Sequence, residues 1–390
     1  MSGGGSRGAY QSGVLKAVGE IADGAGIEWP FKIITGLSAG ALNCGHLASS
    51  EDDLAVTSTD LASVWADLTA DQVFRTDAAS LSSIGGRWVA GLLSGGAART
   101  KKPDALLDTQ PLRDLIAARL DQSAIDSNIS SGRLYGACVS ATEYATSRGV
   151  SFIHGHPEIQ QWRKIRSFAL AQRFRVEHIM ASSAIPMLFP AIKIGQRHYG
   201  DGCLRNLTPI LPAIEMGATR LFVIGVRREM QIDDVPRPGS EGASAGRVLS
   251  VILNAVMMDG LESDLESLAR INRLVHAGNA NVNSDANANA NANGTAPQYR
   301  HIPFLMIRPS RDIAAITIEH ASAMPTLLRY LTRGLGPITQ TAEFISYLLF
   351  QPDFCRALIN LGYSDAMNQA KEITDFLTAE SSDQDGFSAA

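Results

Sequence analysis

The sequence predicts an α/β fold with a largely parallel central sheet. Two observations lead to this prediction. Of the 390 residues, 45% are hydrophobic and 19% are charged, a globular composition that can bury a large core. Short apolar segments typical of strands alternate with longer segments of helical periodicity along most of the chain, the pattern of an α/β domain.

The first half of the chain supplies most of the predicted strands. Apolar side chains recur at helical spacing in one set of segments, and short apolar runs form the other. In order, we expect a helix over 9–22, a buried strand over 31–35, a helix over 39–48, helical structure from 51 to 120 with a Gly/Ser-rich interruption at 80–100, strands over 133–140 and 148–153, and mainly helix over 159–185.

The second half continues the alternation. Residues 190–199 predict a hairpin that turns at Gly195 and Gln196. The remaining predicted elements are a loop and helix over 205–217, a buried strand over 220–226, a long helix over 246–276, a strand over 301–307 and helices over 320–378. No second domain boundary is visible, so we expect one domain over residues 1–378 and a disordered tail over 379–390.

Residues 279–297 read NANVNSDANANANANGTAP and have almost no apolar bulk. Such a composition cannot bury a core, so the tract predicts a disordered loop inserted between a helix and the last strand.

Composition also excludes several classes of function. A formal net charge of -5 argues against a nucleic-acid partner. The four cysteines are far apart and lack CxxC spacing, which argues against a zinc site and a disulfide framework. No signal peptide or transmembrane run is visible, so a cytoplasmic protein is expected.

The composition still allows a peripheral contact with a membrane. Residues 83–102 combine Trp88 and leucines with arginines and lysines, a mixture suited to a membrane interface. A small helix packed on the core is the alternative interpretation of this segment, although its glycines disfavour a stable helix.

The segment GLSAG, from Gly36 to Gly40, is a GxSxG motif with Ser38 at its centre. It lies between a predicted strand and a predicted helix, the setting of a nucleophile elbow. The helix would point its N–H groups and its positive dipole end toward the serine. The alternative is a helix N-cap serine in a glycine-lined turn.

A second glycine turn, GGGSRG, extends from Gly3 to Gly8. It matches the dinucleotide-binding pattern GxGxxG, although that pattern also requires a preceding strand and a later acidic residue. Consecutive glycines expose backbone N–H groups that can stabilise the oxygen of a tetrahedral intermediate. The first turn therefore predicts an oxyanion hole for the serine of the second.

A serine nucleophile needs a base, and none of the eight histidines has a distinctive setting. The segment YGDGC places Asp201 in a tight turn directly after a predicted strand. On its own, an aspartate there is most often a turn residue that bonds its own backbone.

Taken together and in this order, SGGGSRGAYQSGVL, GLSAG and ASSAIPMLFPAIKIGQRHYGDG resemble the patatin-like phospholipase family of bacterial type. RLFVIGV, IRPS and YLLFQPDFCRALINLGYSDA extend the resemblance over most of the chain. It implies a patatin-like three-layer α/β/α fold with a nucleophile elbow. The third motif differs slightly, because Cys203 follows Gly202 where the family usually has Gly or Ala.

The resemblance also implies the chemistry. The family uses a Ser-Asp dyad, so Ser38 would be the nucleophile and Asp201 the base. The backbone of Gly4, Gly5, Ser6 and Arg7 would form the oxyanion hole, supported by the motif glycines Gly3, Gly8, Gly36, Gly40 and Gly202. The expected substrate is a phospholipid or another acyl-ester lipid, cleaved without a metal or a cofactor.

Three alternatives remain open at this point. A hydrolase with a histidine base, for instance His198 or His320, would lose activity with that histidine. A dinucleotide-binding protein would leave GxSxG and YGDGC unexplained. A lipid-binding scaffold without turnover is favoured by the start at Met1, because the family has a strand of about five residues before the glycine turn.

Overall fold

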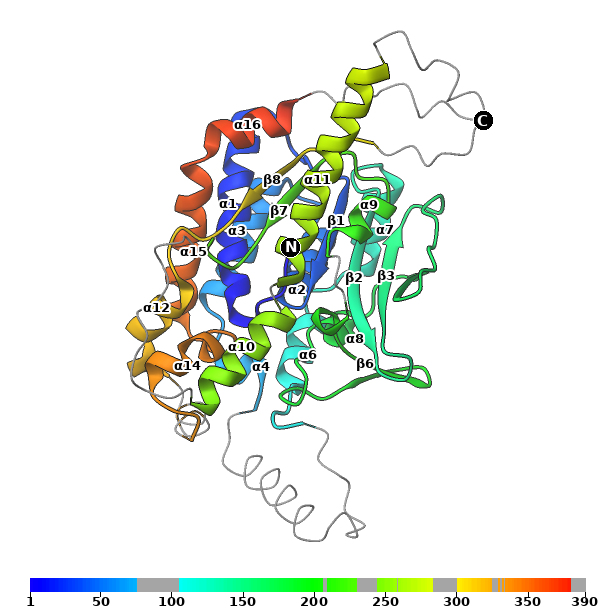
Figure 1. The fold of residues 1–390 in the computed structure, drawn as a ribbon. Coiled ribbons are helices and arrows are strands. Elements are labelled where there is room, and N and C mark those ends of the chain that lie inside the picture. The colour runs from blue at the N-terminus through cyan, green and yellow to red at the C-terminus, as the bar shows by residue number, and fades with distance from the viewer. Residues whose placement is uncertain are drawn as a thin grey trace.

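The computed structural model describes residues 1–75, 105–205, 209–229, 244–257, 259–282, 300–324, 329, 332 and 334–379. Figure 1 shows the strands β2, β3 and β6 on one side of the molecule and the helices α1 and α15 on the other. The described part is therefore a mixed α/β fold, as the alternating pattern predicts.

The main sheet has six strands in the order β4-β3-β2-β6-β5, and β1 also pairs with β2. The strands are β1 (Ile33–Leu37), β2 (Gly136–Glu143), β3 (Arg148–Gly155), β4 (Ser167–Ala171), β5 (Ile192–Ile194) and β6 (Arg197–Asp201).

The prediction of a largely parallel sheet is wrong for this six-stranded sheet, which is mixed. Two of its pairings, β1–β2 and β3–β4, are parallel, whereas β2–β3, β2–β6 and β5–β6 are antiparallel. For the pairs β2–β3 and β5–β6, the reason is the length of the connection. Only residues 144–147 join β2 to β3, and only Gly195 and Gln196 join β5 to β6. A parallel pair needs a crossover of a dozen or more residues, so such short links can only form hairpins.

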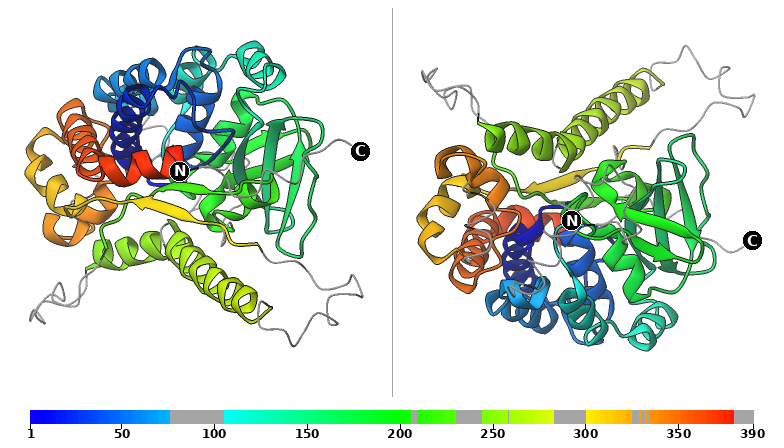
Figure 2. Two further views of the ribbon diagram at one scale, coloured as in Figure 1. Left: turned by 90° about the horizontal axis from the view of Figure 1, so that it is seen from above. Right: turned by 90° about the horizontal axis from the view of Figure 1, so that it is seen from below.

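A second sheet consists of β7 (Leu221–Ile224) and β8 (Phe304–Ile307), which pair in parallel. The helices α10 (Ala245–Met257) and α11 (Asp259–Val282) replace the single helix expected over 246–276. Leu261, Leu265 and Leu268 of α11 pack against the apolar side chains of this small sheet. Figure 2 shows β8 between α10 and α11 on one side and the N-terminal helices on the other.

The helix α1 (Gly8–Gly24) lies at the centre of the helical part, between α3 (Leu54–Ala66) and α15 (Pro352–Met367). Most of its side chains are buried, including Tyr10 and Val14, because its neighbours cover it on several faces. The Tyr10 hydroxyl donates to Asp365 on α15 at 3.0 Å. Residues near the C-terminus thus support the segment that follows the first glycine turn.

The other described helices are shorter. They are α2 (Ala39–Ala48), α4 (Ala70–Val73), α6 (Gln110–Ala117), α7 (Gln122–Ser130), α8 (Val176–Ser182), α9 (Leu211–Glu215), α12 (Ile313–Glu319), α14 (Ile338–Ile345) and α16 (Ala370–Thr378), with 3₁₀ turns η1 (Gly5–Arg7), η2 (Gly202–Leu204) and η4 (Ala321–Ala323). Within these ranges, no helix is both long enough and apolar enough to span a bilayer.

The expectation of mainly helix over 159–185 is wrong, because only α8 is helical there and β4 pairs with β3. The residues 167–171 read SFALA, and Ala and Leu favour helix on their own. Pairing with a buried neighbouring strand outweighs this weak local preference.

Several predicted features lie outside the described residues. These are the candidate membrane segment 83–102, residues 283–297 of the Asn/Ala tract and residues 380–390 of the tail. The first residues of the tract, 279–282, belong to the end of α11 rather than to a loop.

Candidate functional site

Ser38 lies in a strained turn between β1 and α2. Its backbone has φ 52° and ψ −120°, a conformation that residues other than glycine rarely adopt. β1 ends at Leu37 and α2 begins at Ala39, so the turn consists of the serine alone. The residue is 1% exposed. A strained backbone of this kind costs roughly 1–3 kcal/mol and persists only where its surroundings enforce it.

Two serines outside the predicted site enforce this conformation. The Ser38 N–H donates to the hydroxyl of Ser182 at 3.1 Å, and the hydroxyl of Ser183 donates to the Ser38 carbonyl at 3.0 Å. Both lie in the segment ASSA at the end of α8. That segment carried part of the family resemblance, but nothing in its residue pattern reveals that it holds the backbone of Ser38.

Strand register brings Asp201 to the same place. β1 runs parallel to β2 and ends with Leu37 opposite Ser140, whereas β6 runs antiparallel to β2 and ends with Asp201 opposite Ala141. The two strands therefore approach each other along one edge of β2. The turns that follow β1 and β6 meet near the middle of β2. The N–H of Asp201 also donates to Ala184, directly after the two supporting serines, at 2.9 Å.

The Asp201 carboxyl is completely buried and only partly satisfied. Its Oδ1 accepts from the Cys203 N–H at 2.9 Å, whereas Oδ2 has no partner with good hydrogen-bond geometry among the described residues. Burial raises the pKa of Asp201 to about 6, and the Cys203 N–H and the Ser38 hydroxyl oppose that rise. We conclude that the Ser38 hydroxyl lies near the Asp201 carboxyl without a well-formed hydrogen bond between them.

The first glycine turn lies directly against Ser38 and against Cys203, in the turn that follows Asp201. A Cβ added at Gly3 would lie 2.6 Å from the Cys203 sulfur and 3.1 Å from the Ser38 Cβ. Only glycine fits this position without displacing its neighbours. The three motifs, far apart in sequence, are therefore adjacent in the fold, and their glycines Gly3, Gly8, Gly36, Gly40 and Gly202 are all buried.

The backbone donors of the glycine turn are not equivalent. The Ser6 N–H donates to the Tyr347 carbonyl at 3.0 Å, and the Arg7 N–H donates to Gly4 at 3.1 Å. No protein partner is recorded within the described ranges for the N–H groups of Gly4 and Gly5. Gly5 has φ +57°, and a Cβ there would lie 2.1 Å from the Tyr347 oxygen, so the position requires glycine.

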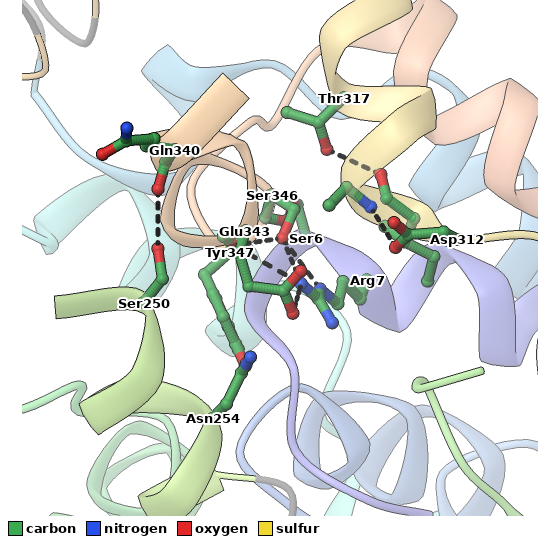
Figure 3. A network of polar contacts seen from close by, with 12 residues as sticks. Ser6, Arg7, Ser250, Asn254, Asp312, Thr317, Gln340, Glu343, Ser346 and Tyr347 are labelled. Carbon is green, nitrogen blue, oxygen red and sulfur yellow. Dashed lines mark hydrogen bonds and ion pairs between the residues drawn. The ribbon is translucent and has the colours of Figure 1, made fainter. Parts of the chain in front are cut away.

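A buried polar network holds the end of this turn. Figure 3 shows the Arg7 side chain directed toward Glu343 and Ser346 at the end of α14. Its Nη2 lies 2.6 Å from a Glu343 carboxylate oxygen, and its Nε donates to the Ser346 hydroxyl at 2.8 Å. The guanidinium also stacks over the Tyr347 ring, 4.6 Å from its centre. No sequence motif indicates Glu343 or Ser346, and the segment that begins at Tyr347 carries part of the family resemblance without revealing these contacts.

Removing the Glu343 carboxylate should destabilise the protein. Arg7 is 2% exposed and Glu343 21%, so Glu343→Ala leaves a buried cation without its counter-ion. We expect a loss of about 3 kcal/mol in the free energy of unfolding, near the lower limit for a broken buried pair. Urea unfolding measures this loss.

The exposed pair Arg311–Glu319 provides the matched control. Glu319→Ala should change the free energy of unfolding by no more than about 0.5 kcal/mol. Equal losses in the two variants would contradict a specific role for Glu343.

The histidines lie elsewhere or have other partners. His46 lies 3.3 Å from Asp60, and His320 contacts the Ile316 carbonyl at 2.9 Å. His178 is buried, and burial lowers its pKa to about 4. The exposed His198 lies on β6, three residues before Asp201. Across the described ranges, no recorded hydrogen bond or ion pair joins a histidine to Ser38 or Asp201.

An apolar cavity begins at Ser38. It has a volume of about 80 Å³ and follows α2 toward His46, eight residues further along. At 1.5 Å of rise per residue, this path is about 12 Å long. The helices α3 and α6 supply much of the remaining wall, and Arg119 and Leu120 lie at its far end. Its lining residues include Leu42, Leu61, Val64, Trp65, Leu112, Ile116, Ile179 and Phe189.

Comparison with known proteins identifies a family that resembles the chain. The family model described as patatin-like phospholipase matches residues 1–214, which include both glycine turns, Ser38 and Asp201. A search of curated proteins returns no match.

Proposed function

Because the chain belongs to the patatin-like phospholipase family, we propose that it is a serine lipid acyl hydrolase with a Ser38–Asp201 dyad. The observation that carries this proposal is the meeting of three motifs. Gly3 of the first glycine turn lies against the strained Ser38 and against Cys203. The buried carboxyl of Asp201 lies near the Ser38 hydroxyl. Strand, strained serine and helix together match the nucleophile elbow of serine hydrolases.

In the proposed acylation step, the Ser38 oxygen attacks the ester carbonyl while Asp201 accepts the hydroxyl proton. The negative oxygen of the tetrahedral intermediate is stabilised by the N–H groups of Gly4 and Gly5, since those of Ser6 and Arg7 already have partners. The N-terminal end of α2, directly after Ser38, contributes a favourable dipole.

Asp201 then returns its proton to the departing alcohol, which is a lysophospholipid when the substrate is a diacyl phospholipid. In deacylation the same carboxylate activates a water molecule, which releases the fatty acid and restores Ser38. Burial supports this role, because it raises the pKa of Asp201 to about 6 and makes the carboxylate a stronger base than an exposed aspartate.

The cavity along α2 supports a lipid as the substrate. It starts at the proposed nucleophile, and apolar side chains dominate its lining. We assign it to the acyl chain of the substrate, with the carbonyl at Ser38 and the methyl end toward Leu120.

Shortening Leu120 should shift the preferred acyl length. Leu120→Ala enlarges the far end of the cavity, so esters with longer chains gain contacts while short esters do not reach this end. One additional buried methylene contributes about 1 kcal/mol or more, so we expect the ratio of kcat/KM between long and short esters to rise about tenfold. A series of p-nitrophenyl esters measures the ratio.

Leu274→Ala is the control for this series, because Leu274 is exposed on α11 and does not line the cavity. The same change of profile in both variants would contradict the assignment of the cavity to the acyl chain.

The proposal is tested by hydrolysis of a fluorescent phospholipid and by labelling with a fluorophosphonate, a reagent for activated serines. We expect turnover of the lipid and mass-spectrometric detection of the label on Ser38. His198→Gln and His320→Gln should each retain activity. Loss of activity in one histidine variant would favour a triad, and lipid binding without turnover or labelling would favour a scaffold.

A further inference from the structure

The side chain of Cys203 lies between the proposed base and the first glycine turn. Cys203 belongs to η2, two positions after Asp201, and is only 4% exposed. Its sulfur lies directly against the turn, because a Cβ added at Gly3 would lie 2.6 Å from it. Burial is the main cause of the raised pKa of Tyr347, and Cys203 adds to it, which places these two side chains close together. The thiol is therefore enclosed by the parts of the proposed site.

The buried thiol needs an acceptor for its S–H. Among the described residues, the recorded side-chain partner of Cys203 is the Asp201 carboxyl. Burial raises the pKa of the thiol well above its ordinary value of 9.0, and the charge of Asp201 and the hydrogen bond to it add to the rise. The thiol thus stays protonated at neutral pH and keeps the hydrogen that it can donate.

The Asp201 carboxylate needs more donors than its backbone contact supplies. An ionised carboxylate has about four acceptor sites. The Cys203 N–H occupies one of them on Oδ1 at 2.9 Å, and Oδ2 has no well-formed partner among the described residues. A fully buried charge with too few donors is costly. The Ser38 hydroxyl can fill one further site, but it gives up its proton during the proposed reaction.

We propose that the Cys203 thiol is a positioning residue that donates its S–H to the Asp201 carboxylate and keeps it directed at Ser38, an inference that rests on the proposed dyad. The contact with Gly3 prevents the sulfur from moving away from the carboxyl. In the acyl-enzyme, the Ser38 oxygen is bonded to the acyl group and no longer donates. The S–H and N–H of Cys203 then hold the carboxylate while it activates water.

Removing the thiol should make Asp201 harder to ionise. Burial raises the pKa of Asp201 to about 6, while the N–H and the side chain of Cys203 oppose the rise. A donor to the charged form lowers the pKa of a carboxyl. Cys203→Ala deletes the side-chain donor and keeps the N–H, so the pKa of Asp201 should rise further. Cys203→Ser supplies a hydroxyl donor at the same position and should reverse this rise.

Other ionisable side chains lie on the elements packed around Asp201. Burial and the charge of Asp201 raise the pKa of Tyr144 above its ordinary value of 10.0, and burial lowers the pKa of His178 on α8 to about 4. Ion pairs hold charged groups of the neighbouring strands and the glycine turn, namely Arg197–Glu143 and Arg7–Glu343. The exposed His198 on β6 is removed by His198→Gln, and the comparison below is repeated in that background.

The test measures kcat/KM for a p-nitrophenyl ester at pH 8 and pH 6 in the parent chain, Cys203→Ala and Cys203→Ser. A base with a pKa of about 6 gives a ratio of about two between these pH values. We expect a ratio of about ten in Cys203→Ala and about two in Cys203→Ser. Cys355→Ala is the matched control, because Cys355 is a buried cysteine on α15 outside the site, and it should keep the parent ratio.

The pH dependence of unfolding provides a second readout, which needs no turnover. A carboxyl with a raised pKa in the folded state lowers stability as pH rises, until the folded-state pKa is passed. In urea unfolding, the free energy of the parent chain should therefore level off above about pH 6. In Cys203→Ala it should continue to fall above this pH, and in Cys203→Ser it should follow the parent chain.

The two readouts separate this inference from the proposed function. If Cys203→Ala leaves both the activity ratio and the unfolding profile unchanged, the inference is overturned and the dyad stands. A shift that Cys203→Ser does not reverse also overturns it, because the sulfur then acts by packing alone. A parent chain without turnover contradicts the proposed function instead, and the unfolding profile then decides the role of the thiol.

Discussion

Ser38→Ala is expected to lower hydrolysis of phospholipids and p-nitrophenyl esters by about 10⁴-fold or more, the size of effect that accompanies loss of a catalytic serine. The variant removes the nucleophilic oxygen only. The hydrogen bonds that hold this turn are made by the backbone of Ser38 to Ser182 and Ser183, so the fold should persist. Steady-state kinetics with thermal unfolding on the same samples measures both quantities.

Ser58→Ala is the matched control, because Ser58 is a buried serine on α3 that lies outside the proposed site. It should retain activity close to that of the parent chain. Comparable residual activity in Ser38→Ala and the parent chain would exclude Ser38 as the nucleophile, whatever its strained backbone suggests.

Asp201→Asn is expected to have the second-largest effect, a loss of about 10³–10⁴-fold in kcat/KM, since a general base contributes up to this amount. Asparagine keeps an oxygen that can accept from Cys203, so the turn itself is preserved. In the parent chain, kcat/KM should fall tenfold for each pH unit below about 6, because the protonated carboxyl cannot accept the serine proton. The residual activity of the variant should lack this dependence.

The same substitution should stabilise the folded protein at neutral pH. The pKa of Asp201 is about 6 in the folded state, above the ordinary value of 3.8. The folded state therefore binds more protons between these values, and this group lowers stability as pH rises from about 4 to 6. Asp201→Asn should gain on the order of 3 kcal/mol at pH 8, and the gain should vanish below about pH 4. A stability loss at pH 8, or activity independent of Asp201, would contradict the assigned role.

Local sequence patterns predicted the elements that one continuous segment forms by itself. The helices over residues 9–22 and 39–48 and the hairpin at Gly195 follow from periodicity and turn residues, and the structure confirms each of them. The strand over 167–171 leaves no such local signal, because its pairing with β3 lies in the tertiary structure. The short connections within the two hairpins account for antiparallel pairs of the mixed sheet.

The sequence by itself determined which residues are candidates for chemistry, because GxSxG, the glycine turn and YGDGC each depend on neighbours within a few positions. Only the tertiary structure decided how they meet. β1 and β6 end opposite adjacent residues of β2, and this register brings Ser38 near Asp201 across more than 160 positions of sequence. Contacts of this long-range kind also join Ser182 and Ser183 to Ser38, and Glu343 and Tyr347 to the glycine turn. A contact between distant segments leaves no periodic trace in either one, so it becomes visible only when the chain is folded.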